Sequence, residues 1–153
     1  MNELMSGKAI RRTKMGLKVD RATATLPQTA AAAIFNVVGG RVCITEIIGE
    51  VTTAIQNQAN NTKLTANPDN GTSVDMCAVL SIANDEVGTL YGITGTVGDA
   101  MIGVNAGCVP EQAKGIIVNT GTIDIDCAAS NTGSVKWTVL YYPIDDGAYI
   151  TAA

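Results

Sequence analysis

The sequence predicts an all-β fold, a jelly-roll-like β-sandwich or barrel with an extended basic N-terminal arm, and three observations support it. The 153-residue chain is rich in Ala, Thr, Val and Ile, and its 16 glycines separate short β-branched runs, as is typical of strands and turns. Turn signals recur about every 8 to 15 residues and bound about nine or ten short strands. No convincing long helix interrupts this pattern, and its period is not constant, which argues against a propeller or a solenoid.

The composition is that of a folded chain with few charges for its surface. Hydrophobic residues make up 46% and charged residues 16% of the chain, which excludes a disordered chain and indicates that other protein covers part of the surface. We assign residues 1–21 to the basic arm and residues 22–153 to a single β-sandwich domain. No run reaches the roughly 18 apolar residues of a membrane helix, so no membrane is expected as a partner. No apolar segment follows the N-terminal charges as it would in a signal peptide.

Charge is distributed unevenly between the arm and the body. Residues 1–21 contain six basic and two acidic side chains, and the remainder contains four basic and twelve acidic ones. The segment is either a solvated, flexible terminus or an arm that docks on an acidic neighbour. Nucleic acid is a weaker partner, because the arm has no aromatic residue for stacking and the acidic body would repel phosphates. The candidate docking residues are Lys8, Arg11, Arg12, Lys14 and Lys18.

The first predicted strands follow the arm. Residues 23–26 form a short strand before a proline, and residues 30–38 and 41–56 flank Gly39-Gly40. Two glycines between β-branched runs predict a tight hairpin, since glycine accepts positive φ without steric cost.

The middle of the chain is less regular. Residues 62–66 and 74–82 are predicted strands on either side of a strong turn, N-P-D-N-G. Residues 87–93 are one helical turn or a short strand, and residues 94–107 are irregular chain.

The last forty residues show the clearest alternation. Ile123, Ile125 and Cys127 are predicted to face inward, with the aspartates between them facing outward. The run 134–142 follows a S-N-T-G turn, which predicts a hairpin between the two runs. One of its faces carries Trp137, which we interpret as a core anchor rather than a ligand-stacking residue.

Two adjacent tyrosines end this last run. Because Tyr141 and Tyr142 point to opposite faces of a strand, one of them lies outside or in a subunit interface. Aromatic residues with one polar end suit such contacts. We take Tyr142 as the candidate contact with another copy of the chain or with a partner protein.

The residues that most enzymes need are scarce. The chain has no histidine, which removes the Ser-His and Cys-His pairs and the usual base near neutral pH. The four widely spaced cysteines form no C-x-x-C pair, so we expect free buried thiols rather than a zinc site, although disulfides stay open. Asp124 and Asp126 share one strand face and are interpreted as a solvated surface rather than a Ca²⁺ site. We therefore expect no enzyme activity, no metal and no cofactor.

Three motifs within residues 22–153 are informative together: Leu26-Pro27-Gln28, Gly39-Gly40-Arg41-Val42, and the strand from Gly133 through Trp137 to Tyr141-Tyr142-Pro143. In these motifs, residues 22–153 resemble small structural proteins encoded in the head-gene clusters of tailed bacteriophages and prophages. The resemblance implies a virion component without catalytic residues, most readily a capsid decoration (cement) protein. Proteins of that family are often β-rich and trimeric, and a terminal arm often reaches a neighbouring subunit. The implied partner is the major capsid protein, and the implied location is the capsid surface after synthesis in the host bacterial cytoplasm.

Two alternatives of other classes stay open. The first alternative is another virion part, such as a tail tube, head-tail joining or head fibre protein. The second is a host-surface carbohydrate-binding module. A tail-tube protein polymerises by itself, whereas a decoration protein binds only assembled shells. A carbohydrate-binding module needs exposed aromatic platforms, and this chain has one Trp, one Phe and four Tyr.

Overall fold

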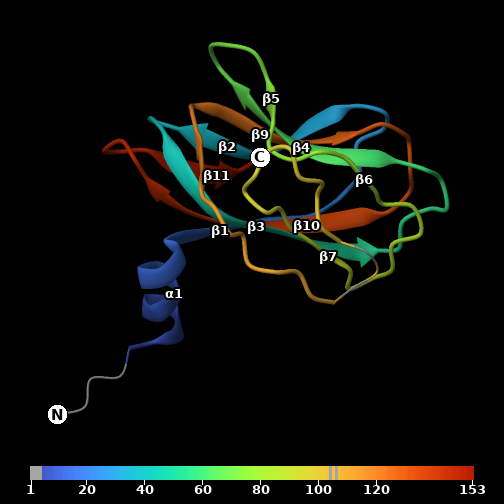
Figure 1. The fold of residues 1–153 in the computed structure, drawn as a ribbon, viewed down its shortest axis with the longest axis horizontal. Helices are drawn as coiled ribbons and strands as arrows, with labels where there is room; N and C mark the ends of the chain where they lie inside the picture. Colours follow the sequence, from blue (N-terminus) through green and yellow to red (C-terminus); the bar gives the residue numbers. More distant parts are fainter. Residues whose placement is uncertain (1–4, 104, 106) are drawn as a thin grey trace.

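The computed structural model describes residues 5–103, 105 and 107–153, and it is a sandwich of two antiparallel β-sheets (Figure 1). The first sheet has the order β1-β10-β3-β7, with β8 also paired to β3, and the second has the order β11-β2-β9-β4-β5, with β6 also paired to β4. The strands of the first sheet are β1 (Leu17–Thr25), β3 (Val42–Thr53), β7 (Leu90–Tyr91), β8 (Ile116–Val118) and β10 (Ser134–Pro143). Those of the second are β2 (Ala31–Val38), β4 (Asn61–Pro68), β5 (Val74–Asp75), β6 (Leu80–Ser81), β9 (Gly121–Cys127) and β11 (Tyr149–Ala152). The all-β prediction is confirmed, as a sandwich.

The chain crosses between the sheets where the sequence predicts hairpins. β2 pairs with β9 and β3 pairs with β10, so the hairpin predicted at Gly39-Gly40 is wrong. The hairpin predicted between residues 122–127 and 134–142 is wrong for the same reason, since β9 and β10 lie in different sheets. Both turns reverse the chain as expected, but the returning strand packs over its predecessor instead of beside it. At Gly39 (φ 80°), a Cβ would lie 2.6 Å from the Gly147 carbonyl oxygen, so this crossing packs against the connection from β10 to β11, which also passes from one sheet to the other.

The N-terminal segment is not the extended arm that its charge suggests. Residues Gly7–Met15 form helix α1, and the predicted domain boundary at residue 21 falls inside β1, which pairs with β10 along its length. The Ser6 side chain caps the helix by accepting a hydrogen bond from the Ala9 N–H, and Gly16 ends it with φ 95°. Residues 17–25 alternate in burial and so fit the edge of a sheet. α1 projects from one end of the sandwich (Figure 1).

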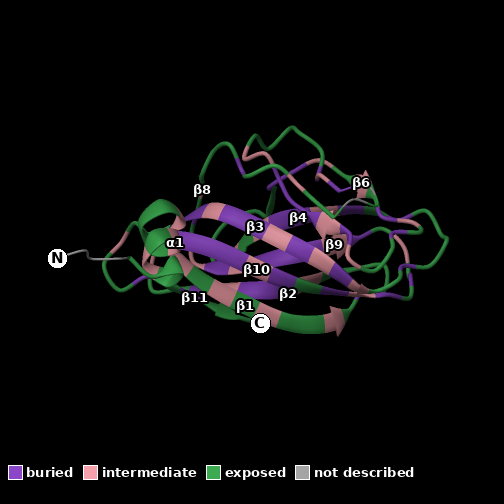
Figure 2. Ribbon diagram, turned by 90° about the horizontal axis from the view of Figure 1, so that it is seen from below, coloured by how far each residue is buried: buried purple, intermediate pink, exposed green. Residues whose placement is uncertain are grey.

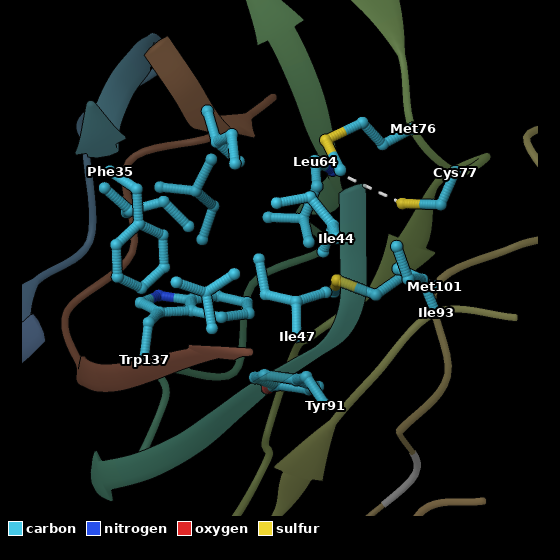
Figure 3. Close-up of a cluster of buried hydrophobic side chains, with 14 of the residues drawn as sticks. Phe35, Ile44, Ile47, Leu64, Met76, Cys77, Tyr91, Ile93, Met101 and Trp137 are labelled. Carbon is cyan, nitrogen blue, oxygen red and sulfur yellow. Dashed lines mark hydrogen bonds between the residues drawn. The ribbon is translucent and has the colours of Figure 1, made fainter. Parts of the chain in front are cut away.

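The core fills the space between the sheets. Trp137 from β10 and Phe35 from β2 meet from opposite layers, beside Ile47 and Leu64 (Figure 3). Tyr91 stacks against Trp137 with ring centroids 6.3 Å apart. The prediction that Trp137 is a core anchor is confirmed. Purple stripes of buried residues along β3 and β10 are visible in Figure 2.

Other sequence predictions are settled residue by residue. Cys43, Cys77 and Cys127 are free and buried as expected, whereas Cys108 is exposed. The predicted strand over residues 74–82 is broken into β5 and β6, and the open choice over residues 87–93 resolves as the short strand β7. Ile123, Ile125 and Cys127 do face the core. Asp124 is only 8% exposed, so a freely solvated carboxylate is wrong there, because it lies between Ala33 and Thr65 on the neighbouring strands.

Candidate protein-docking surface

Exposed apolar side chains gather where α1 leaves the sandwich. We call this region the α1 end; it comprises α1, the end of β10 with the connection to β11, and the paired ends of β2 and β11. Gly16 packs against the backbone of Tyr141 and Tyr142, and Val38 pairs with Tyr149, which places these elements together. The exposed large hydrophobic residues at the α1 end are Met5, Ile10, Val38, Tyr142, Ile144 and Tyr149. Such a cluster is typical of a surface that another protein covers.

The two adjacent tyrosines divide as the strand alternation predicts. Tyr141 is buried, and its hydroxyl accepts a hydrogen bond of 3.1 Å from the Ile150 N–H. Tyr142 is 47% exposed and points away from the core. The prediction that one of them lies outside is therefore confirmed, and Tyr142 is the outer one.

The five predicted docking residues are not equivalent. Lys14 Nζ lies 3.0 Å from Glu111 Oε2, and Lys18 Nζ lies 2.9 Å from Asp20 Oδ2. Arg11 is half-buried between the helix and the sheet. Lys8 and Arg12 are exposed and form no ion pair with any residue that the structure describes. These two are consequently the charges that remain available to a partner.

Lys18 belongs to the sheet surface rather than to an arm. It lies on β1, and its neighbour Asp20 accepts a hydrogen bond of 2.7 Å from the Thr138 hydroxyl. Hydrogen bonds from Thr138 and Lys18 lower the pKa of Asp20 below its usual range. The carboxylate therefore stays ionised beside Lys18, which reduces the attraction of that lysine for an external acid.

An apolar groove of about 300 Å³ lies on another part of the surface. Val74, Val97 and Ile117 line it, and each is more than half exposed. These residues come from three segments that are far apart in the sequence, so no local pattern could have indicated the groove. The same holds for Val38 and Tyr149 at the α1 end, which meet only through strand pairing.

One buried polar pair is formed by Tyr91 and Asp85. The Tyr91 hydroxyl donates a hydrogen bond of 2.5 Å to Asp85 Oδ2, and both side chains are almost fully buried. Burial raises the pKa of Asp85, although the hydrogen bond from Tyr91 opposes that shift. This hydrogen bond links two residues that are six positions apart in the 85–91 segment, so we interpret it as a contact that stabilises the fold.

The described residues contain neither a group of metal-ligating side chains nor a helix long enough to span a membrane. Within residues 5–103, 105 and 107–153, no three His, Cys, Asp or Glu side chains are grouped so that they could hold a metal ion. The only described helix, α1, is too short to cross a bilayer. Comparisons of the chain with protein-family models, with curated proteins and with solved structures gave no significant match.

Proposed function

We propose that the chain is a bacteriophage capsid decoration protein that binds the outside of the assembled head and bridges major capsid subunits. The observation that carries this proposal is the α1 end, where Lys8 and Arg12, which form no ion pair with any described residue, share one helix with exposed Ile10, and where Tyr142 is exposed at the end of β10. Arginine and tyrosine are enriched in protein interfaces, and charge complementarity steers the encounter. The α1 end suits an acidic, partly apolar partner surface.

The form of α1 supports a docking role. It has nine residues, none of them buried, and isolated helices of fewer than about 12 residues are marginal in water. A partner that covers Ile10 and pairs Lys8 and Arg12 would stabilise it. The predicted arm thereby becomes a short basic helix held at Gly16, and docking requires no long disordered reach.

The order of the strands supports the jelly-roll form of the sandwich. The first four strands alternate between the sheets, and β1-β10-β3-β7 faces β2-β9-β4-β5, with β11 added at the edge beside β2. This is the arrangement expected of a jelly roll, an architecture that viral capsid domains share with lectins and cupins. The same architecture hosts unrelated functions, so the proposed function rests on the surface residues, and the fold is only compatible with it.

The remaining parts of the proposal follow from the resemblance to phage head proteins. The chain acts as a homotrimer on the capsid surface of the virion, after synthesis in the host bacterial cytoplasm. It has no enzymatic activity and uses no cofactor. Its function is mechanical, since each copy contacts more than one subunit of the shell.

The test is co-sedimentation with undecorated shells of the major capsid protein encoded in the same gene cluster. A double variant, Lys8→Glu with Arg12→Glu, is compared with the wild type at low and physiological salt. We expect at least a tenfold loss of affinity, equivalent to about 1.4 kcal/mol, and a weaker salt dependence. The control is Lys63→Gln with Lys136→Gln, compared with Lys8→Gln and Arg12→Gln, so that each pair of variants removes two positive charges without placing an acid beside Asp75 or Glu50.

Three outcomes would overturn the proposal. The first is unchanged shell occupancy in the Lys8/Arg12 variant, or an equal loss in the control. The second is spontaneous assembly of the chain into tubes, which favours a tail protein. The third is specific glycan binding without shell binding. Light scattering of the free chain checks the trimer separately.

A further inference from the structure

The connection between β4 and β5 carries a chemically labile pair of residues. It includes Asp69-Asn70-Gly71 and projects from the sandwich (Figure 1). Asn70-Gly71 is the one Asn-Gly dipeptide in the sequence. The side-chain amide of an asparagine can close a five-membered ring with the backbone nitrogen of the next residue, and a glycine leaves that nitrogen sterically open. The connection is therefore a candidate site of spontaneous backbone chemistry.

The connection is held at its beginning but not at its tip. The Asp69 N–H donates a hydrogen bond of 2.9 Å to the Thr120 carbonyl oxygen. The next two residues, Asn70 and Gly71, are both exposed. Neither the Asn70 side chain nor the Gly71 N–H forms a hydrogen bond with a residue that the structure describes. Both reacting groups are thus open to water and free to approach each other.

The backbone at Gly71 leaves space around its nitrogen. Gly71 has φ 124°, a conformation that residues with a side chain rarely adopt. A Cβ built there would meet only Pro68, at 3.6 Å from Cγ. No packed group therefore shields the Gly71 nitrogen, and the turn itself requires the glycine that makes the nitrogen accessible.

Two other asparagines show what protection looks like in the same fold. Asn131 is 1% exposed, its side-chain amide donates a hydrogen bond of 3.3 Å to the Gln56 carbonyl oxygen, and the Thr132 N–H donates one of 3.2 Å to Gln56 Oε1. After Asn119, the Thr120 N–H donates one of 2.9 Å to Asn119 Oδ1. In both cases the following nitrogen is engaged and belongs to a β-branched residue.

We propose that Asn70 is a self-modification site, at which the side-chain amide is converted to aspartate and isoaspartate through a cyclic succinimide. Hydroxide removes the Gly71 amide proton, and the nitrogen attacks Asn70 Cγ. The new C–N bond closes the ring, the Cγ–Nδ2 bond breaks, and the side-chain nitrogen leaves as ammonia with a proton from water, which regenerates hydroxide. Water then opens the ring. Opening at Cγ gives aspartate, and opening at the main-chain carbonyl gives isoaspartate.

The reaction changes both charge and backbone at this place. One water is consumed and one ammonia is released, so no oxidant or reductant is needed. Either product carries a carboxylate next to Asp69 that is ionised at neutral pH. Isoaspartate also lengthens the backbone of the connection by one methylene group. Pro68 and Thr72 of this connection line the apolar groove, so copies become more acidic beside it as they age. The proposal is independent of shell binding.

The test is incubation of the folded protein at about pH 7 and about pH 9, followed by peptide mapping with mass spectrometry and enzymatic methylation of isoaspartate. The reaction should be faster at the higher pH, because the Gly71 amide must first lose its proton. Asn70 should convert at least about tenfold faster than Asn119 or Asn131. Asn70→Gln keeps an amide but requires a larger ring, and Gly71→Ala hinders the nitrogen; each should slow conversion at this position at least about tenfold.

A matched control separates the dipeptide from its place in the fold. Thr132→Gly puts a glycine after the buried Asn131, and circular dichroism checks that the variant is folded. In the folded variant Asn131 should convert at least about tenfold more slowly than Asn70, whereas in urea the two rates should become similar.

Three results would overturn the proposal. The first is conversion of Asn70 no faster than that of Asn119 in the folded wild type, which stays decisive if Thr132→Gly does not fold. The second is an unchanged rate at Asn70 in Gly71→Ala, since the Gly71 nitrogen would then not be the attacking group. The third is equal conversion of Asn70 and Asn131 in the folded Thr132→Gly variant, because the open tip would then have no role.

Discussion

Gly49 and Trp137 face each other on neighbouring strands, and the indole ring occupies the space that a side chain at residue 49 would need. The two residues are paired in the β3–β10 register. A Cβ built on Gly49 would lie 2.8 Å from two carbon atoms of the indole ring. Trp137 is the largest buried side chain, so the glycine on β3 allows the central strands to accommodate it.

We expect Gly49→Ala to destabilise the protein by about 1–3 kcal/mol, because the added methyl group displaces the packed indole. Urea unfolding measures the change. Gly98→Ala is the control, since a Cβ there meets nothing within 4 Å. Alanine ordinarily stabilises a strand relative to glycine by roughly 0.5–1 kcal/mol, so a stabilised Gly49→Ala variant would contradict the contact.

Glu46 makes stability depend on pH in a defined direction. Burial raises its pKa above the ordinary 4.5, so the folded state holds the proton more tightly than the unfolded state. This contribution is complete below the ordinary value and is lost as pH rises through the raised one. Glu46→Gln lacks that loss, and its stability relative to the wild type should therefore increase across this window. Urea unfolding from about pH 4 to pH 8 tests it, with Glu50→Gln, at a half-buried position of the same strand, as the comparison. A pH-independent difference would show that Glu46 does not titrate as its burial implies.

Asp145 should produce the opposite pH dependence. Its Oδ2 accepts hydrogen bonds from the Arg41 N–H and Nε, and its Oδ1 accepts one of 2.7 Å from Nη2. These bonds lower the pKa of Asp145 well below 3.8, so its contribution is present above that value and is lost as pH falls through the lowered pKa. We expect Asp145→Asn to lower the melting temperature at neutral pH and to have less effect in acid. Asp146→Asn, at the exposed neighbouring position, should have little effect at either pH.

The Ser6 cap should decide whether α1 persists in the free protein. Its Oγ accepts a hydrogen bond of 3.1 Å from the Ala9 N–H. Removing such a cap costs a helix about 1 kcal/mol, and α1 has no buried residue to compensate. We expect Ser6→Ala to reduce hydrogen-exchange protection in α1 about fivefold, with the sandwich unaffected. Ser6→Asp keeps an acceptor and should retain the protection; equal loss in both variants would exclude a capping role.

Local patterns were sufficient for the strand faces. The alternation predicted Trp137 as a core anchor and placed Tyr141 and Tyr142 on opposite faces, and the structure has Trp137 and Tyr141 in the core with Tyr142 outside. The same type of pattern misjudged Asp124, because its burial depends on Ala33 and Thr65 of adjoining strands. A strand's period of two residues reports which face is apolar, but it cannot report what the neighbouring strands place beside a side chain.

The candidate docking residues show the same division. Their concentration before residue 21 is a property of the sequence. That Lys14 is neutralised by Glu111, 97 residues away, follows only from the packing of α1 beside the 109–112 segment. Lys8 and Arg12 remain available because no described acid lies beside them.

The amino-acid order alone specified an all-β chain, its turns and most of its core residues, since these depend on backbone preferences and on alternation between neighbours. Which strands pair with each other is decided only in the folded molecule. Gly39-Gly40 reverses the chain equally well into a hairpin or across to the facing sheet, and the choice depends on burying Phe35 and Trp137 against each other. Pairing is a competition among contacts distant in sequence, and its outcome is decided by the packing of the whole core.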